Sequence, residues 1–389
     1  MAPCSLRIEF GDQITLTDAL NNAGRFPKRN TAFLSQFTDA SNVRDFRFRN
    51  TTELTFGTNS VQSDDILCKQ FRGTPVSRSP IRHRNAITYC VDQNVLPYAL
   101  YSAEQAILCT PNRDFDVLIC SLDRLDIPQH FADLGIRSVH IDLQSEIAAE
   151  NLPLGWLPIT TYLRLWLPRY FHATYDRILY LDADTMIQTD RLCALFKCDL
   201  NDCVIASARD VQQWKNLNKP IHDYEKRQIR HQKYLNSGVQ LIDCARYVDD
   251  RCLERMLEAN QRGEHLLQHD QSLVNLVLMD EIAELHPTWN WQWSSNYPLF
   301  SVFAQPQILH FCGFSKPWDT NTVYPRALSV SLYLFLARHF PDQAISPLEP
   351  SAYDTTWRAR ITALIHHALG LRALHKLTKR FETDLTTLK

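Results

Sequence analysis

Glycine is scarce in this chain of 389 residues, with 10 copies, and no stretch reads G-x-G-x-x-G or G-x-x-x-x-G-K. Those spacings are typical of dinucleotide-binding and P-loop proteins, so both classes are disfavoured. The chain also lacks the run of about 18 apolar residues that a membrane-spanning helix needs. Its first residues, MAPCSLRIEFGDQ, contain no apolar core segment of a signal peptide. A formal net charge of −2 gives no electrostatic reason to expect nucleic-acid binding.

The cysteine pattern gives little support for disulfides or zinc. The 11 cysteines are an odd number and form no C-x-x-C pair. The spacing of Cys193, Cys198 and Cys203 matches no common zinc-binding pattern. We therefore expect buried, reduced thiols of the kind found in cytoplasmic proteins.

The texture of the sequence changes near residue 86. Residues 1–80 are rich in Thr, Asn, Arg and Phe without a clear period, and they predict an N-terminal extension of unassigned role. Residues 72–85 are polar, basic and broken by prolines, as in a linker. From residue 86, short apolar runs alternate with helical segments, which predicts an α/β architecture with a mainly parallel sheet. The predicted strands are 86–91, 116–122, 137–143, 177–184, 203–210 and 237–244.

Two pairs of aspartates share the spacing D-x-D. Asp182 and Asp184 close an apolar run in the stretch RILYLDADTMI (177–187), whereas Asp114 and Asp116 precede the run VLIC. In a parallel sheet, ligands bind beyond the carboxyl ends of the strands. The first pair is therefore expected at the ligand edge, either as a metal site or as a strand-end turn. The second pair is expected at a strand's start, as solvated turn residues.

Further motifs accompany the first pair. Asp92 and Asp210 also close apolar runs and are expected at the same edge. Taken alone, Asp270 would be a helix N-cap and His310 a core histidine. The four downstream stretches that carry polar residues are YLNSGVQLI (234–242), HDQSLVN (269–275), LHPTWNWQ (285–292) and ILHFCGFSKPW (308–318).

These stretches, with VDQN (91–94), YLRL (162–165) and LYLDADTMI (179–187), resemble glycosyltransferase family 8. That family includes glycogenin and bacterial galactosyl- and glucosyltransferases of lipopolysaccharide assembly. The resemblance runs from about Ala86 to Trp318, with the motifs in the family's order. It implies a GT-A fold with a mainly parallel sheet over residues 85–325. The N-terminal extension and a helical C-terminal region, 326–389, would flank this domain.

The resemblance also implies a metal site. Asp182, Asp184 and His310 would hold a divalent cation that bridges the diphosphate of the donor. Carboxylate oxygens with one imidazole suit Mn²⁺, with Mg²⁺ as the alternative. Lys316 would stabilise charge on the departing nucleoside diphosphate, and Gly313 would let the backbone approach the phosphates.

The remaining implied site residues surround the sugar nucleotide. Asp92 and Asn94 would contact the uracil and ribose, and Arg164 would reach the donor. The implied catalytic residues are Gln271, Asp270 and Asp210. Ser272 stands where the family often has another acid, so a second sugar-contacting carboxylate is not expected there. The implied donor-binding set is Asp92, Asn94, Arg164, Asp182, Ala183, Asp184, Asn236, Ser237, Gly238, Asp270, Gln271, His310, Gly313 and Lys316.

The implied reaction is a metal-dependent, retaining transfer of galactose or glucose from UDP-galactose or UDP-glucose to a glycan or glycolipid, such as the lipopolysaccharide core. Gln271 stands where a double displacement needs a nucleophile, and an amide oxygen is poorer in that role than a carboxylate. We therefore expect a front-face route, in which the departing phosphate oxygen takes the acceptor's proton. The alternatives are a catalytically silent sugar-nucleotide-binding or scaffold protein, a self-glucosylating enzyme like glycogenin, and a nucleotidyltransferase.

Residues 356–381 contain six Lys/Arg and no acid. Leu371, Leu374 and Phe381 are predicted near one face of a helix, with Arg372 and the neighbouring basic residues 376–380 on another. Such a helix either lies on an anionic membrane surface or packs on its own domain with a solvated basic face. We expect a cytoplasmic protein, peripheral to the inner face of the membrane under the first alternative.

Overall fold

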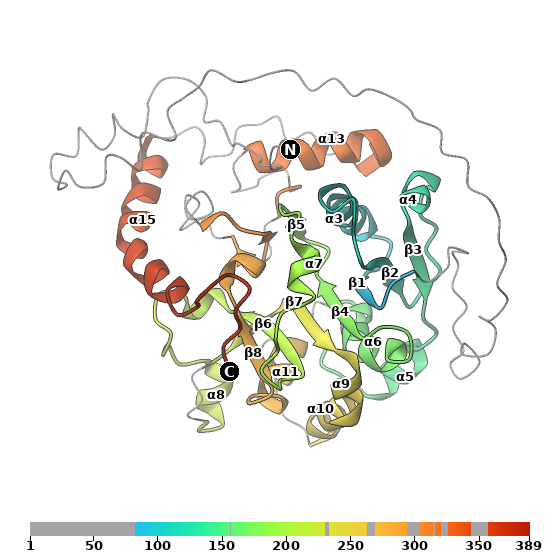
Figure 1. The fold of residues 1–389 in the computed structure, drawn as a ribbon, viewed down its shortest axis with the longest axis horizontal. Helices are drawn as coiled ribbons and strands as arrows, with labels where there is room; N and C mark the ends of the chain where they lie inside the picture. The colour runs from blue at the N-terminus through green and yellow to red at the C-terminus, as the bar shows by residue number, and fades with distance from the viewer. Residues whose placement is uncertain are drawn as a thin grey trace. The chain divides into compact units, whose positions relative to one another are not determined.

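The structure, a computed structural model, describes residues 82–155, 157–229, 233–262, 269–293, 304–313, 316–319, 326–343 and 357–389. The N-terminal extension predicted for residues 1–80 lies outside the described residues, as does most of the predicted linker. Helices and strands carry the labels shown in Figure 1.

A seven-stranded sheet forms the centre of the fold, with the strand order β3-β2-β1-β4-β7-β6-β8, and a second sheet has the order β5-β10-β9. The strands β1 to β4 pair in parallel, as do β6 and β8, which confirms the predicted α/β class with a mainly parallel sheet. The strands are β1 (Asn85–Cys90), β2 (Asp116–Ser121), β3 (Ile136–His140), β4 (Arg177–Leu181), β5 (Thr185–Ile187), β6 (Ile205–Arg209), β7 (Leu235–Asp243), β8 (Ile282–Leu285), β9 (Trp291–Gln292) and β10 (Ile308–His310).

Helices cover the sheet, so strands such as NAITYC and DVLICS are buried at nearly every position instead of alternating. Figure 1 shows α5, α6, α9 and α10 grouped together, apart from α3 and from α13, which packs against α3. The α-helices are α3 (Leu96–Cys109), α4 (Gln129–Asp133), α5 (Gln144–Ala149), α6 (Leu163–Phe171), α7 (Leu192–Leu195), α8 (His222–Lys226), α9 (Cys244–Asp249), α10 (Cys252–Gln261), α11 (His269–Val277), α13 (Arg326–His339) and α15 (Trp357–Thr378). The 3₁₀ turns are η4 (Ile159–Tyr162), η5 (Val211–Gln213), η6 (Pro287–Asn290) and η7 (Pro341–Gln343).

Strand β7 runs antiparallel to both of its neighbours, β4 and β6. Its first residues therefore lie at the edge where β4 and β6 end. This reversal brings Asn236, Ser237 and Gly238, which are part of β7, to the same edge as Asp182. In an all-parallel sheet, residues at the start of a strand would lie at the opposite edge.

The stretch 177–187 is two strands, not one. Strand β4 ends at Leu181, the aspartates form a turn, and β5 begins at Thr185 in the other sheet. There β5 pairs antiparallel with β10, so that Thr185 stands opposite His310. The chain thus changes sheets at the aspartate pair, and the change of sheet brings His310 next to it.

The second aspartate pair corrects one prediction. Asp116 begins β2, as expected for a residue at a strand's start, but only 7% of it is exposed. Its Oδ2 accepts a hydrogen bond from the Tyr175 hydroxyl at 2.9 Å and lies 3.5 Å from Nη1 of Arg137. The prediction of a solvated turn residue was wrong for Asp116, because a buried hydroxyl and guanidinium take the place of water.

Helix α15 packs partly on its own domain and partly exposes apolar side chains, and its predicted place on a membrane surface stays a prediction. Its Leu374 is buried, and so is Phe381 beyond the helix, whereas Leu371 is 45% exposed. Trp357, Ile361 and Ile365 are exposed at four-residue spacing, which places them on one face of the helix. None of the described helices is both long and apolar enough to cross a bilayer.

The segment after α15 packs along the edge of the large sheet, beside β8 (Figure 1). Leu388 and Glu284 of β8 exchange backbone hydrogen bonds of 2.6 and 3.0 Å. Arg380 donates to both carboxylate oxygens of Glu284, at 2.6 and 2.7 Å, so it is not part of the predicted solvated basic face. Asp384 pairs with Arg191 at 2.6 Å. These contacts cover the edge of the sheet with residues 380–388, which we call the C-terminal segment.

Candidate functional site

The turn between β4 and β5 is held by the start of β7. The Asp182 N–H donates to the Gly238 carbonyl at 2.8 Å, and the Thr185 hydroxyl donates to the Asp182 carbonyl at 2.9 Å. Ala183 is the middle residue of the turn. Both aspartate side chains are thereby fixed at the carboxyl end of β4.

Asp182, Asp184 and His310 meet at this edge, with one ligand atom from each lying within 4.8 Å of the others. His310 Nε2 is 3.6 Å from Oδ2 of Asp182 and 3.3 Å from Oδ1 of Asp184. The His310 side chain is 4% exposed and those of the aspartates are 26% and 14% exposed. The three predicted ligands therefore form one partly open cluster.

The charged groups in this cluster stabilise one another's ionised forms. Burial alone would raise the pKa of Asp182, but Arg164 and His310 outweigh it and hold that pKa below its usual value. Burial likewise opposes ionisation of Asp184, and Lys316 and His310 lower its pKa. Both carboxylates are therefore held ionised, which is the form in which they can bind a cation.

Asn290, in η6, orients the imidazole and was not singled out from the sequence. Its Oδ1 lies 2.9 Å from Nδ1 of His310, and its Nδ2 donates to Oδ1 of Asn236 at 2.8 Å. Holding one ring nitrogen leaves the other directed at the aspartates. The stretch LHPTWNWQ contains this residue, but an asparagine is common in turns, so the sequence gives no signal for its role.

Gly238 is required by close approach. A Cβ at this position would lie 2.1 Å from Cε1 of His310 and 2.6 Å from Oδ2 of Asp182. His310 is buried, and both neighbours are held by several partners, so neither can move aside at low cost. Glycine here lets β7 pass directly beneath the proposed ligands.

Arg164, at the start of α6, ties two acids together. Its guanidinium lies 3.2 Å from Oδ1 of Asp182 and 3.3 Å from Oδ2 of Asp270, and 4.5 Å above the ring of Tyr180. It also donates to the Ser237 carbonyl at 3.3 Å. Burial raises the pKa of Asp270 and Arg164 partly offsets that rise. Arg164 is 8% exposed, so it holds the carboxylates of Asp182 and Asp270 in position from the buried side of the site.

Gln271, in α11, is fixed at both ends of its amide. Its Oε1 accepts hydrogen bonds from Asn236 Nδ2 and the Ser237 N–H, each at 3.1 Å. Its Nε2 donates to Oδ2 of Asp210 at 3.0 Å. Asp270 lies beside this group, 3.4 Å from the Ser237 hydroxyl. All predicted sugar-side residues are thus in one hydrogen-bonded group.

Lys316 adds a further positive charge at the carboxyl end of β4. Its ammonium group contacts Asp184 and donates to the Phe311 carbonyl at 2.8 Å, and its backbone N–H donates to Asp319 at 2.6 Å. Gly313, in the loop before it, has φ of +94°, a conformation that side chains disfavour.

Asp92 and Asn94 follow β1 at the same edge of the sheet. Asp92 Oδ1 accepts the N–H groups of Asn94 at 2.9 Å and Val95 at 3.2 Å, so its side chain orders the turn that leads into α3. Within the described residues no hydrogen bond joins either side chain to the aspartate turn. Their predicted contact with the uracil and ribose stays a prediction.

A divalent cation fits this donor set. Ligands on an octahedral ion with bonds of about 2.1 Å are about 3 Å apart. The separations of 3.3 and 3.6 Å between His310 Nε2 and the carboxylates are close to that spacing. Two carboxylates and one imidazole match the preferences of Mn²⁺ and Mg²⁺ better than those of a thiophilic ion.

The fold belongs to the GT-A class. The chain is similar to a crystal structure of the galactosyltransferase LgtC in complex with donor and acceptor sugar analogues, with a TM-score of 0.53 and 20% identity over 66% of this chain and 96% of that one. It is also similar to the apo structure of the bifunctional glycosyltransferase WbbM, with a TM-score of 0.52 and 14% identity over 74% of this chain and 53% of that one. These likenesses show the fold alone.

The sequence profile of glycosyl transferase family 8 matches residues 86–322, and the chain belongs to that family. General stress protein A of Bacillus subtilis (strain 168) is 29% identical, over 49% of this chain and 70% of that protein. Lipopolysaccharide 1,2-glucosyltransferase of Escherichia coli (strain K12) is 26% identical, over 54% and 63%. Lipopolysaccharide 1,3-galactosyltransferase of Salmonella typhimurium (strain LT2) is 26% identical, over 65% and 77%. The chain thus spans slightly less than two thirds of the Escherichia coli relative.

Proposed function

We propose that this protein transfers a hexose, galactose or glucose, from a UDP-sugar to a glycan or glycolipid, with retention at the anomeric carbon. The observation that carries the proposal is the grouping of Asp182, Asp184 and His310 beside Lys316 at the carboxyl edge of the sheet. A nucleoside diphosphate is the kind of leaving group that such a cluster can bind. The names of two relatives, a glucosyltransferase and a galactosyltransferase of lipopolysaccharide, favour the lipopolysaccharide core as acceptor.

The departing diphosphate develops negative charge as the glycosidic bond breaks. A cation bound by Asp182, Asp184 and His310, with Mn²⁺ preferred and Mg²⁺ as the alternative, would neutralise part of that charge. Lys316 is positioned to exchange its contact with Asp184 for a phosphate oxygen. Its charge would then be preorganised for the leaving group.

Gln271 supports a front-face route. Both ends of its amide are engaged, and the oxygen already accepts two hydrogen bonds. An acceptor of two hydrogen bonds has little electron density left for attack on the sugar, which disfavours a covalent adduct. We infer that Gln271 and Asp210 stabilise positive charge near the anomeric carbon, and that the departing phosphate oxygen takes the acceptor's proton.

The test is a screen of UDP-sugars for metal-dependent release of UDP. We expect Asp184→Asn to reduce turnover by at least about a hundredfold while the protein stays folded. Asp114→Asn, in the other D-x-D pair, is the matched control and should leave turnover unchanged, because Asp114 precedes β2 at the opposite edge of the sheet and pairs with exposed Lys197. Absence of any UDP-sugar turnover in the parent protein would favour the silent scaffold alternative instead. Sugar found on the protein itself would favour self-glucosylation.

Metal binding needs its own control, because a second group of possible ligands lies on α3, α4 and α13. Glu104, His130 and His339 also place one ligand atom each within 4.8 Å of the others. The metal titration should therefore be repeated with His339→Gln. Loss of the activating metal in Asp184→Asn, but not in His339→Gln, would assign it to the aspartate turn.

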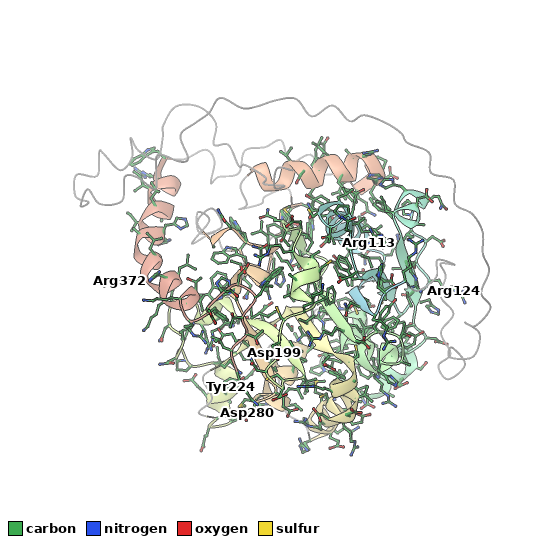
Figure 2. The ribbon with its side chains drawn as sticks, viewed as in Figure 1. Arg113, Arg124, Asp199, Tyr224, Asp280 and Arg372 are labelled. Carbon is green, nitrogen blue, oxygen red and sulfur yellow. The ribbon has the colours of Figure 1, made fainter. Side chains whose placement is uncertain are left out.

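We further propose that the protein is cytoplasmic and attaches to an anionic membrane surface through α15, where a glycolipid acceptor resides. Trp357, Ile361 and Ile365 form an exposed apolar patch on the first half of the helix. Arg372 (labelled in Figure 2) and Lys376 are exposed on its second half. Apolar insertion together with basic contacts to headgroups is the pattern of helices that lie in a membrane interface.

Sedimentation with phosphatidylglycerol vesicles tests this attachment. We expect Arg372→Gln with Lys376→Gln to release most of the protein from the vesicles at physiological salt. Arg124→Gln with Lys226→Gln removes the same charge from exposed positions outside α15 and should leave binding intact. Equal binding of both double variants would refute membrane attachment through α15 and leave the transferase proposal standing.

A further inference from the structure

A cationic cavity lies at the edge of the sheet opposite to the catalytic edge. It has a volume of about 180 Å³, and its charged lining residues are Arg82, His83, Arg113, Asp116 and Arg137. These residues precede or begin β1, β2 and β3, which run parallel. The proposed metal ligands follow the end of β4, which is parallel to β1. The two sites are therefore separated by the length of the strands.

The acidic residue that lines the cavity does not balance the positive charge of its arginines. Three guanidinium groups face one carboxylate, which leaves a formal excess of two positive charges. Asp116 Oδ2 is already engaged by the Tyr175 hydroxyl and by the Arg82 N–H at 3.2 Å. Burial lowers the pKa of Arg113, and the charge of Arg82 lowers it further. Mutual repulsion of this kind is relieved by an anion.

Arg137 also has an unsatisfied donor. It is 8% exposed, and its Nε is buried without a hydrogen-bond partner in the described part of the chain. Its Nη1 donates to the Tyr175 hydroxyl at 3.3 Å. Buried donors in native proteins are nearly always paired, and an unpaired one commonly marks a place for a ligand or an ion.

Arg113 is held in position by the turn before β3. Its Nη2 donates to the Leu134 carbonyl at 3.0 Å. The next residue, Gly135, has φ of +90°, and a Cβ there would lie 3.0 Å from the same Nη2. The glycine thus allows both the turn and the close approach of the guanidinium, which is preorganised at the cavity wall.

We propose that this cavity binds a phosphate group, a tetrahedral oxyanion with about two negative charges. Arginine forks pair with phosphate oxygens through strong charge-assisted hydrogen bonds. Cavities that enclose whole small-molecule ligands measure roughly 300–1,000 Å³, so this one accepts a single phosphate group and not an entire nucleotide sugar. The source is either inorganic phosphate or the phosphate of a small phosphomonoester. This site is independent of the proposed sugar transfer.

The test is calorimetric titration of the full chain with inorganic phosphate and with glucose 1-phosphate, in EDTA and at constant ionic strength. EDTA removes divalent ions that would attract phosphate to the catalytic edge. We expect saturable binding that weakens by about tenfold or more in Arg113→Gln, because at least one charge-assisted hydrogen bond is lost. Equal affinity for both ligands indicates free phosphate, and tighter binding of glucose 1-phosphate indicates a phosphomonoester.

Three further variants keep the result decisive. Arg82→Gln alters an exposed side chain that the fold does not need and should also weaken binding. Arg124→Gln, beyond the opposite end of β2, is the matched control (both Arg113 and Arg124 are labelled in Figure 2). Asp184→Asn should bind phosphate like the parent protein. Absence of saturable binding, or equal affinities of the parent, Arg82→Gln and Arg113→Gln, would overturn the proposal.

Discussion

Replacing Arg380 by alanine should destabilise the whole fold, although the residue is remote from the catalytic edge. Its guanidinium bonds both oxygens of Glu284, a residue that is 1% exposed. Breaking a buried ion pair costs about 3–5 kcal/mol when the remaining charge is left alone. Here Arg209 still pairs with Glu284, at 2.6 and 3.1 Å. We therefore expect a loss of about 2–3 kcal/mol in the free energy of unfolding.

Urea unfolding at pH 7 measures this loss, with Lys379→Ala as the matched control. Lys379 is the exposed neighbour in sequence, and its removal should cost less than about 0.5 kcal/mol. Burial would raise the pKa of Glu284, but Arg380 and Arg209 outweigh it and hold that pKa below 4.5. The pair therefore stabilises the fold above about pH 4.5 and loses this effect as the pH falls through the folded-state pKa.

The difference between the parent protein and Arg380→Ala should accordingly shrink in acid, whereas that for Lys379→Ala should stay small throughout. Two results would refute the reasoning. One is equal stability of the two variants at pH 7. The other is a loss in Arg380→Ala that is the same at pH 7 and pH 3.

Three further outcomes are expected. Gly238→Ala should weaken divalent-metal binding at least about tenfold by calorimetry, since its Cβ would overlap His310 and Asp182; an unchanged affinity would contradict the close approach. Asn290→Ala should weaken the same binding by roughly 10–100-fold, because His310 Nδ1 loses its amide partner and keeps the weaker contact with Cys312 Sγ at 3.2 Å. Near-parental affinity would show that the ring does not need Asn290 for its orientation. Burial lowers the pKa of His286 to about 4, so it contributes stability at pH 7 that is lost between about pH 6.5 and pH 4. Thermal melts of His286→Gln should show a shallower acid decline, worth up to about 3 kcal/mol, and a parallel decline would exclude His286 as its cause.

The order of the sequence motifs selected most of the residues that meet at the carboxyl end of β4, with Asn290 as the exception. Strand polarity separated the pair Asp182 and Asp184 from the pair Asp114 and Asp116, and the structure brings His310 next to the first pair. Their roles as metal ligands stay predictions. The sequence could not reveal that β7 is reversed, because a strand's apolar pattern is the same in either direction.

Contacts between residues that are distant in sequence explain the other differences between the predictions and the structure. Asp116 is acidic and starts a strand, so local chemistry predicts a solvated residue. Its burial depends on Tyr175 and Arg137, which are distant in sequence. Arg380 looked like one of several basic residues on a helix face until its partner Glu284, 96 positions away, was located. Asn290 acquires its role only from the ring that it contacts.

The C-terminal segment has a consequence for how the chain matures. The outer edge of β8 stays uncovered until residues 380–388 have been synthesised, because Leu388 supplies its backbone partner and Arg380 neutralises its carboxylate. A nascent chain, or one clipped before Arg380, presents an open strand edge that invites aggregation and proteolysis. Removal of residues 380–388 therefore opens the outer edge of β8 to pairing with another strand.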